Sequence, residues 1–410
     1  MQFMNCIIKD GDAEMVSEEA NSGCVYYLPH HGVYHPKKPD KLRVVFDCSA
    51  KFQGSSLNAH LLSGPDLTNS LLGVLFRFRR YPIGIMCDVE KMFHRFHVHP
   101  EDRDYLRFLW WKDGDVSKEP LDYRMNVHLF GATSSPGCAN FGLKYLARLY
   151  EQEYPLAAPF LCQDFYVDDG VTSVESVETA IQLVAEAREL YERGKLHLHK
   201  FVSNNPDVVE SVPVSERAAG LQKVDLNKND LPMERTLGIQ WCIGSDDFTF
   251  QVHVKEQSDT RRGVLAIVAS IYDPMGFISP FVLKGKAILQ DMCKRSMLWD
   301  DPVPEGLMPR WQKWKADIDN LKAIHVRRCY KPADFDSVIR IELHHFSDAS
   351  TSGYGVCSYL RFVSEDRVHC CLVASKARVS PTKIVTIPRL ELTAAVIAVK
   401  LSSVTWVRPS

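Results

Sequence analysis

The chain has 410 residues, of which 45% are hydrophobic and 24% charged, and its formal net charge is −2 at pH 7. This composition excludes a disordered or fibrous protein and predicts two or three globular domains with a sizeable core. It also excludes a protein that is basic over its whole surface, so any phosphate-binding groove must come from local clusters of Lys and Arg.

The cysteines and the N-terminus favour an intracellular protein. Twelve cysteines are scattered without a Cys-x-x-Cys pair, which is typical of free thiols in a reducing compartment. Residues 1–10 lack the basic start and the long apolar region of a signal peptide. The most apolar run, residues 263–272, is too short to cross a bilayer. We therefore expect a protein of the cytoplasm or nucleus that is neither secreted nor bound to a membrane.

Local basic clusters are the candidates for contacts with phosphate. Each of them, taken alone, is more typical of a solvated surface run. They are Lys37-Lys38, Arg77-Phe78-Arg79-Arg80, Arg261-Arg262 and Arg327-Arg328.

The first third of the chain predicts a hairpin, then helices, then a buried strand. Residues 1–24 are polar and acidic and are interpreted as a helix or a frayed terminus. Residues 26–34 and 41–47 read as two strands joined by a turn-rich, basic segment. Leucines near helical spacing in residues 56–78 predict one or two helices. Residues 81–88 form a continuous apolar run that ends in an aspartate, as in a buried strand.

The next segments predict two more strands and a loop built of small residues. Residues 106–111 and 121–127 read as strands. In residues 129–141, small side chains let backbone approach a ligand, and Ser134 or Ser135 can cap a helix that begins at Pro136. His94, His97 and His99 precede these strands at mixed spacing, and since no second paired cluster accompanies them, a zinc site is not favoured.

Residues 162–172 carry two adjacent aspartates and are the segment on which the functional prediction depends most. They read as two short strands joined by a tight turn that contains Asp168, Asp169 and Gly170. Adjacent carboxylates repel each other unless a cation compensates, so the pair suits a divalent metal ion, although a solvated Asp-Gly turn is also common. The predicted buried strand ends at Asp88 and would place this acid at an edge of the sheet. Two-metal phosphoryl transfer needs oxygen ligands from separate strands, and these three acids have that composition.

The remaining pattern alternates helices and strands. Residues 173–194 predict an amphipathic helix with Val177, Ile181, Val184 and Tyr191 on one face and Gly194 as its stop. A strand follows, and residues 203–232 are rich in turn formers and predict a loop or an extended insertion. Further on come a hairpin, a helical region over residues 260–314, a second hairpin over residues 339–359 and a helix near residues 387–395.

Several motifs together resemble a known family. Tyr166-Val167-Asp168-Asp169, and Asp88 followed five residues later by Phe93, resemble the palm motifs of reverse transcriptases. The sequence of residues 273–280, Asp-Pro-Met-Gly-Phe-Ile-Ser-Pro, is similar to a segment of the Pao/BEL group of LTR retrotransposons. The resemblance covers roughly residues 26–401.

The resemblance implies an α+β fold with a right-hand polymerase of fingers, palm and thumb, followed by a connection and an incomplete ribonuclease H-like α/β domain. The implied bounds are 1–24 for an N-terminal segment, 25–235 for fingers and palm, 236–335 for primer grip, thumb and connection, and 336–410 for the ribonuclease H-like domain.

The resemblance also implies a role for each acid. Asp88, Asp168 and Asp169 would be the catalytic residues and the ligands of Mg²⁺ or Mn²⁺ in two-metal nucleotidyl transfer to a primer 3′-hydroxyl. Asp169 is expected to matter least. Asp348 and Glu391 would be two acids of a vestigial ribonuclease H site. The fold needs a further strand and acid beyond the Glu391 helix, so ribonuclease H activity is not expected.

Residues that contact the nucleotide and the nucleic acid are implied in the same way. Arg43 would hold the triphosphate, Lys200 would lie near its phosphates, and Phe93 would exclude the ribose 2′-hydroxyl. Each residue also has a structural alternative. Arg43 could form a surface pair with Asp47, Lys200 could be an exposed lysine on a strand, and Phe93 could be a core aromatic. Phe130 stands where retroviral sequences have Gln, which leaves open which group of that loop contacts the nucleotide. The implied template and primer contacts are Ser135, Pro136, Leu237 and Gly238.

The sequence thus predicts an RNA-directed DNA polymerase that uses an RNA or DNA template, a primer and deoxynucleoside triphosphates. Two alternatives remain. One is a catalytically inactive retroelement fragment that binds nucleic acid, and the other is a stand-alone nuclease that uses Asp348 and Glu391. No aspartic protease motif and no integrase-type zinc pattern is found in the sequence.

Overall fold

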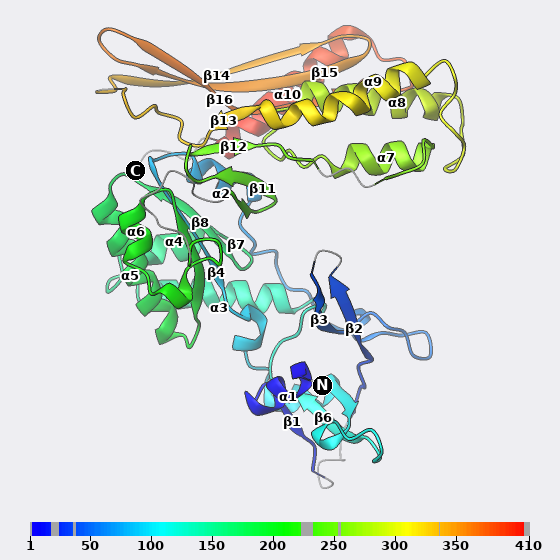
Figure 1. The fold of residues 1–410 in the computed structure, drawn as a ribbon, viewed down its shortest axis with the longest axis vertical. Coiled ribbons are helices and arrows are strands. Elements are labelled where there is room, and N and C mark those ends of the chain that lie inside the picture. Colours follow the sequence, from blue (N-terminus) through cyan, green and yellow to red (C-terminus); the bar gives the residue numbers. More distant parts are fainter. Residues whose placement is uncertain are drawn as a thin grey trace. The chain divides into compact units, whose positions relative to one another are not determined.

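The computed structural model describes residues 2–17, 24–35, 38–222, 233–252, 256–335 and 337–405, and it shows mixed helix and sheet (Figure 1). The chain forms two compact units. The first unit comprises Met1–Asn69, Asp88–Asp168 and Leu183–His199, and the second comprises Ser70–Cys87, Asp169–Gln182 and Lys200–Ser410. These units are discontinuous in sequence and do not follow the predicted domain bounds, which remain a prediction.

The first unit begins with a helix and several strands around an aromatic core. The hairpin predicted for residues 26–47 is confirmed as an antiparallel pair of strands. Phe46, Phe108 and Tyr123 pack together in the core of the first unit, and the rings of Phe108 and Tyr123 are stacked. The elements are α1 (Gln2–Lys9), β1 (Ala13–Met15), β2 (His30–His35), β3 (Lys38–Phe46), η2 (Leu57–Ala59), β5 (Arg107–Trp110) and β6 (Leu121–Met125). Strands β1, β6 and β5 form one sheet in that order, and β1 was not predicted.

Short helical turns and two α-helices complete the first unit. They are η3 (Met92–Arg95), η4 (Pro100–Leu106), η5 (Lys112–Gly114), α3 (Ser135–Leu149) and α4 (Ala157–Gln163). Helix α3 has proline in its first turn, as predicted, but the Ser134 side chain makes no capping hydrogen bond. Ser135 is not the cap either, because it is the first residue of α3 and its hydroxyl contacts His128.

A four-stranded sheet has the order β7-β8-β4-β9. Its strands are β4 (Ile83–Val89), β7 (Phe165–Tyr166), β8 (Asp169–Val174) and β9 (Leu198–Ser203). The strand predicted over residues 81–88 is confirmed as β4. Helix α5 (Val177–Arg193) ends directly before Gly194, as expected. Its predicted apolar face is partly wrong, because Ile181 is exposed while Val184 and Tyr191 are buried.

The second unit contains another four-stranded sheet, in the order β10-β11-β12-β13, and a helical layer. The strands are β10 (Met233–Thr236), β11 (Ile239–Cys242), β12 (Asp247–Thr249) and β13 (His325–Arg327). The helices are α2 (Leu71–Phe78), α6 (Pro206–Glu210), η6 (Val214–Glu216), α7 (Arg261–Ser270), α8 (Ser279–Lys294), α9 (Met308–Ala316) and η7 (Asp317–Ala323). Trp311 and Trp314 are buried between α7, α8 and α9.

The predicted helical region of the second unit is confirmed, and two other predictions are corrected. Residues 260–314 contain the three helices α7, α8 and α9. Residues 56–78, predicted as one or two helices, form only η2 and α2, because most of residues 56–70 are not helical. The predicted loop over residues 203–232 contains α6 and η6, and its residues 223–232 lie outside the described part.

The last part of the second unit is a three-stranded antiparallel sheet with one helix (Figure 1). The elements are β14 (Arg340–Ala349), β15 (Gly353–Val363), β16 (Val368–Val379) and α10 (Ile387–Thr405). Helix α10 packs on β14 and β15, while α8 packs on β16. In the described part of the chain, no helix combines the length and apolarity that a membrane span requires.

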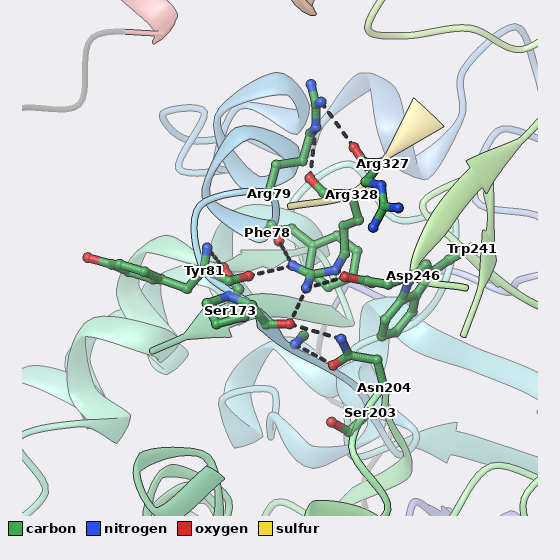
Figure 2. Close-up of polar contacts among 12 residues, drawn as sticks. Phe78, Arg79, Tyr81, Ser173, Ser203, Asn204, Trp241, Asp246, Arg327 and Arg328 are labelled. Carbon is green, nitrogen blue, oxygen red and sulfur yellow. Dashed lines mark hydrogen bonds and ion pairs between the residues drawn. The ribbon is translucent and has the colours of Figure 1, made fainter. Parts of the chain in front are cut away.

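Two arginines that the sequence placed in surface runs are instead buried in the second unit (Figure 2). The exposed fractions of Arg79 and Arg328 are 1% and 0%. Arg328 binds both carboxylate oxygens of Asp246 and the carbonyls of Phe78, Tyr81 and Pro82. The prediction of a solvated surface is therefore wrong for these two positions, because their guanidinium groups satisfy buried backbone acceptors.

Arg79 is bound differently from Arg328. Its guanidinium donates to the carbonyls of Leu372, Val373, Arg327 and Arg328 and lies over the rings of Phe277 and Tyr330. Burial lowers the pKa of Arg79. The two arginines thus join the end of α2, the β13 segment and strand β16 by hydrogen bonds.

Replacing Arg328 by leucine should strongly destabilise the protein. The change leaves the Asp246 carboxylate and several carbonyls without their donor, and breaking a buried ion pair costs about 3–5 kcal/mol. Denaturation followed by tryptophan fluorescence measures this, since Trp241 packs beside the cluster and donates to Asp246. The control is Arg262→Leu, which removes an exposed pair with Asp300 and should leave the midpoint nearly unchanged. Equal losses in the two variants would contradict the role of Arg328.

Candidate active site

Two of the three predicted palm acids lie close together in the first unit. Asp88 is the penultimate residue of β4, and the next residue, Val89, donates its N–H to the carbonyl of Asp168 at 2.9 Å. The Asp88 side chain is 20% exposed, and Asp168 and Asp169 are partly exposed. Strand pairing therefore places Asp88 and Asp168 at neighbouring positions, where both can be reached from solvent.

A histidine that the sequence did not single out contacts the first acid. Nε2 of His199 lies 2.6 Å from Oδ1 of Asp88, so the imidazole donates to this carboxylate. Two residues earlier on the same segment, Nδ1 of His197 lies 3.2 Å from a carboxylate oxygen of Glu90. The alternation His197-Leu198-His199 was a usable signal, because residues two apart share a strand face. In this segment only the adjacent Lys200 was predicted as a site residue.

The turn that carries Asp168 differs from the predicted one. Strand β7 ends at Tyr166 and β8 begins at Asp169, so Val167 and Asp168 form the turn and Gly170 lies within β8. Val167 has φ of 58°, which is a left-handed conformation that β-branched residues rarely adopt. Such backbone costs on the order of 1–3 kcal/mol and is concentrated at functional sites. The sequence placed the turn one residue too late because it followed the Asp-Gly signal.

The chemistry of these side chains fits a divalent cation, although the described side chains do not form a complete cage. Carboxylate oxygens are the ligands that Mg²⁺ and Mn²⁺ prefer. Among the described residues, however, no three or more His, Cys, Asp and Glu side chains are grouped as metal ligands. Because Asp88 already contacts His199, a metal ion there would have to share or replace that contact.

Phe93 lies beneath a second aromatic side chain. It sits in η3 and is 5% exposed, whereas Phe130 is 58% exposed. The two ring centroids are 4.5 Å apart and the rings meet edge to face at 87°. The structure therefore brings together the predicted ribose-excluding residue and the residue that replaces the retroviral glutamine.

The loop that presents Phe130 is held by one asparagine. Asn58 donates to the carbonyl of Gly131 at 2.8 Å and accepts from the N–H of Thr133 at 3.0 Å. Beyond the loop, Ser135 is buried with its hydroxyl 3.3 Å from Nδ1 of His128, and burial lowers the pKa of His128. The neighbouring Pro136 is exposed in the first turn of α3.

The other predicted contacts lie on separate elements. Arg43 is exposed on β3 opposite Val33, and among the described residues it forms no ion pair with Asp47, whose Oδ1 accepts from the N–H of Ser49. Lys200 is exposed on β9 with φ of 55°.

Leu237 and Gly238 form the two-residue turn between β10 and β11. Their φ values are 48° and 82°, and this pair of positive values is the twist that a tight hairpin requires. A Cβ at position 238 would lie 2.6 Å from the Tyr272 ring, so glycine is needed there.

The two predicted ribonuclease H acids lie on the last sheet and its helix. Asp348 is exposed near the end of β14, opposite Gly355 on β15. Glu391 is exposed in α10, the helix that packs on β14 and β15.

Comparisons with known proteins first define the fold. A foamy viral protease-reverse transcriptase, in a form named dRH and in complex with double-stranded DNA, matches with a TM-score of 0.63 and 12% identity over 100% of this chain. A foamy viral protease-reverse transcriptase in complex with an RNA/DNA hybrid matches with a TM-score of 0.60 and 12% identity over 98% of this chain. At this identity the likeness concerns the fold, which resembles that of reverse transcriptases. This chain spans 60% and 46% of the lengths of those two chains.

A family comparison makes the assignment more specific for part of the chain. Residues 260–407 match the model of the Pao retrotransposon-like RNaseH-like domain. The resemblance to Pao retrotransposons is therefore confirmed over this region. No curated protein matches the chain.

Removing the Asn58 side chain should loosen the loop without unfolding the unit. In Asn58→Ala, the N–H of Thr133 loses its acceptor, and one hydrogen bond is worth about 1 kcal/mol, so its hydrogen exchange should quicken about 5-fold. Hydrogen exchange of peptides that contain Thr133 measures this. Asn69→Ala is the matched control, since Asn69 bonds elsewhere, to the carbonyl of Phe165. Unchanged exchange in Asn58→Ala would show that the asparagine does not hold the loop.

Proposed function

We propose that this chain is an RNA-directed DNA polymerase domain of a retrotransposon, with a right-hand arrangement of fingers, palm and thumb. The observation that carries the proposal is the hydrogen bond from Val89 to Asp168, which joins the two chain segments that bear the acids. Asp169 follows directly in sequence. A reverse-transcriptase-like fold and a Pao-like region support the same reading.

In this proposal Asp88, Asp168 and Asp169 hold Mg²⁺ or Mn²⁺. Bound there, the metal ions would activate the primer 3′-hydroxyl and stabilise negative charge on the α-phosphate of the deoxynucleotide. The part-exposed position of the acids is consistent with access by a substrate. The strained turn at Val167 holds Asp168 at a defined place beside the end of β4.

The protein's other side chains would bind and orient the substrates. Arg43 is exposed and unpaired with Asp47, so its planar guanidinium can bind triphosphate oxygens in two places. Lys200 would add positive charge near the phosphates. Phe93, together with the more exposed Phe130 that packs edge to face on it, would form the surface that a ribose 2′-hydroxyl cannot approach.

The proposed partners are a template, a primer and deoxynucleoside triphosphates. The two similar solved structures contain double-stranded DNA and an RNA/DNA hybrid, and we extend that class of ligand to this chain. The tight turn at Leu237 and Gly238 would contact the primer, and the start of α3 at Ser135 and Pro136 would lie near the template. The proposal gives Asp348 and Glu391 no part in the polymerase reaction.

A second candidate is a retroelement fragment that binds nucleic acid without polymerising. The contact between His199 and Asp88 favours it, because one oxygen of the first acid is already engaged. Such a protein would bind primer–template equally well with and without divalent metal.

Primer extension separates the two candidates. The chain should extend an oligo(dT) primer on a poly(rA) template in Mg²⁺ or Mn²⁺, and Asp168→Asn should slow extension about 100-fold or more, because metal ligands contribute several kcal/mol to the transition state. The control is Asp102→Asn, which changes an exposed acid of the first unit. Wild-type protein that binds primer–template yet adds no nucleotide in either metal would refute the polymerase and leave the fragment.

Nucleotide selection tests the aromatic pair. Phe93→Val should lower the preference for deoxynucleotides over ribonucleotides about 10-fold or more, since the bulk beneath the sugar is reduced. Phe130→Ala should have a smaller effect in the same direction, because it removes only the ring that supports Phe93. Competition between dTTP and UTP during extension measures this. Phe141→Ala, an exposed aromatic on α3, should leave the preference unchanged. An unaltered preference in Phe93→Val would exclude it as the selecting residue.

A further inference from the structure

A cavity of about 610 Å³ lies in the second unit, among α8, β16 and α10. This volume is in the range of pockets for small molecules and cofactors. The cavity contains none of the residues that the polymerase proposal uses. It is bounded on one side by Asp273, Pro274 and Gly276, which belong to the family-like motif over residues 273–280.

Four cationic side chains line this cavity: Lys286 from α8, Lys376 and Arg378 from β16, and Lys400 from α10. All four are exposed. In the part of the chain that the structure describes, none of them forms an ion pair with an acidic side chain. Three elements therefore converge to place an excess of positive charge around one cavity, in a chain whose net charge is −2.

The cavity's one acidic lining residue, Asp273, lies within electrostatic reach of Lys286 and cancels only part of this charge. Asp273 accepts from the N–H of Phe277 at 2.9 Å and from the N–H of Ile278 at 2.8 Å, so both oxygens are engaged by backbone. Burial raises the pKa of Asp273. The role of Asp273 is thus to hold the turn rather than to pair with the lysines.

The wall of the cavity is rigidly attached to β16. Ser375 donates its N–H to the carbonyl of Met275 at 2.8 Å and its hydroxyl to the carbonyl of Gly276. Gly276 has φ of 76°, and a Cβ there would lie 1.9 Å from the Ser375 carbonyl oxygen. Only glycine permits this approach, which fixes the motif beside Lys376 and defines the shape of the cavity.

The remaining lining is aliphatic and includes Ile271, Val282 and Ile397. A ligand that fits both surfaces has an apolar body and several negative charges close together. We propose that this cavity binds a nucleoside polyphosphate, with the base against the aliphatic wall and the phosphates among the four cations. Because the site is separate from the polymerase acids, it does not depend on the proposed function.

Titration calorimetry on the full chain, in EDTA and 150 mM NaCl, tests the proposal with ATP as the probe. ATP should bind, and Lys286→Gln should weaken binding about 10-fold, as expected for one lost charged hydrogen bond. Lys284→Gln is the matched control, because Lys284 is exposed on the same helix but does not line the cavity. Lys376→Gln is a second variant on another element and should act like Lys286→Gln. Thermal unfolding should be unchanged in all three.

Further probes identify the chemistry that is recognised. Adenosine should not bind, and inorganic tripolyphosphate should bind more weakly than ATP, because each lacks one half of the ligand. Asp168→Asn should bind ATP as the wild type does. If Asp168→Asn abolishes binding, the nucleotide occupies the polymerase acids and the proposal fails.

Three other results overturn the proposal. They are an absence of ATP binding, equal weakening by Lys284→Gln and Lys286→Gln, and binding of single-stranded oligonucleotide that depends on Lys286 while ATP does not bind. The polymerase proposal is tested by primer extension and survives each of these outcomes.

Discussion

The buried ion pair between Arg328 and Asp246 is the contact on which the second unit depends most (Figure 2). The guanidinium of Arg328 has no exposed surface, and it also donates hydrogen bonds to carbonyls at the end of α2 and just before β4. Arg79 adds bonds to β16. Segments that are up to 294 residues apart in sequence are joined in this way. Desolvating two guanidinium groups is costly, so this packing is stable only when every donor is satisfied.

The acids of the first unit differ from this buried ion pair, because they are partly exposed to solvent. Asp88 and Asp168 are held near each other by backbone pairing, and the turn between β7 and β8 keeps Val167 in a strained conformation. Strain of this kind persists only where the surrounding structure enforces it, which is a property of functional sites. Nε2 of His199 contacts one carboxylate oxygen of Asp88 at 2.6 Å. The fold therefore brings these two acids together, and a metal ion is the partner that we propose for them.

Sequence reasoning performed best where the signal was local. The strand that ends near Asp88, the hairpin around Leu237 and Gly238, and helix α5 were predicted because apolar periodicity and turn residues act over a few positions. It failed where distant segments decide the outcome. Arg79 and Arg328 look like surface charge until their carbonyl partners are known, and His199 gains meaning only from its contact with Asp88.

The sequence by itself determined which side chains this protein has available: three acids and several aromatic and basic residues in motifs that resemble those of reverse transcriptases, and a Pao-like region over residues 260–407. The tertiary structure alone decided which of these groups meet. It paired Phe93 with Phe130, placed His199 on Asp88 and gathered four cations around one cavity. The physical reason is that residue types and local periodicity are written in the chain, whereas burial and long-range contacts follow from the packing of all its elements together.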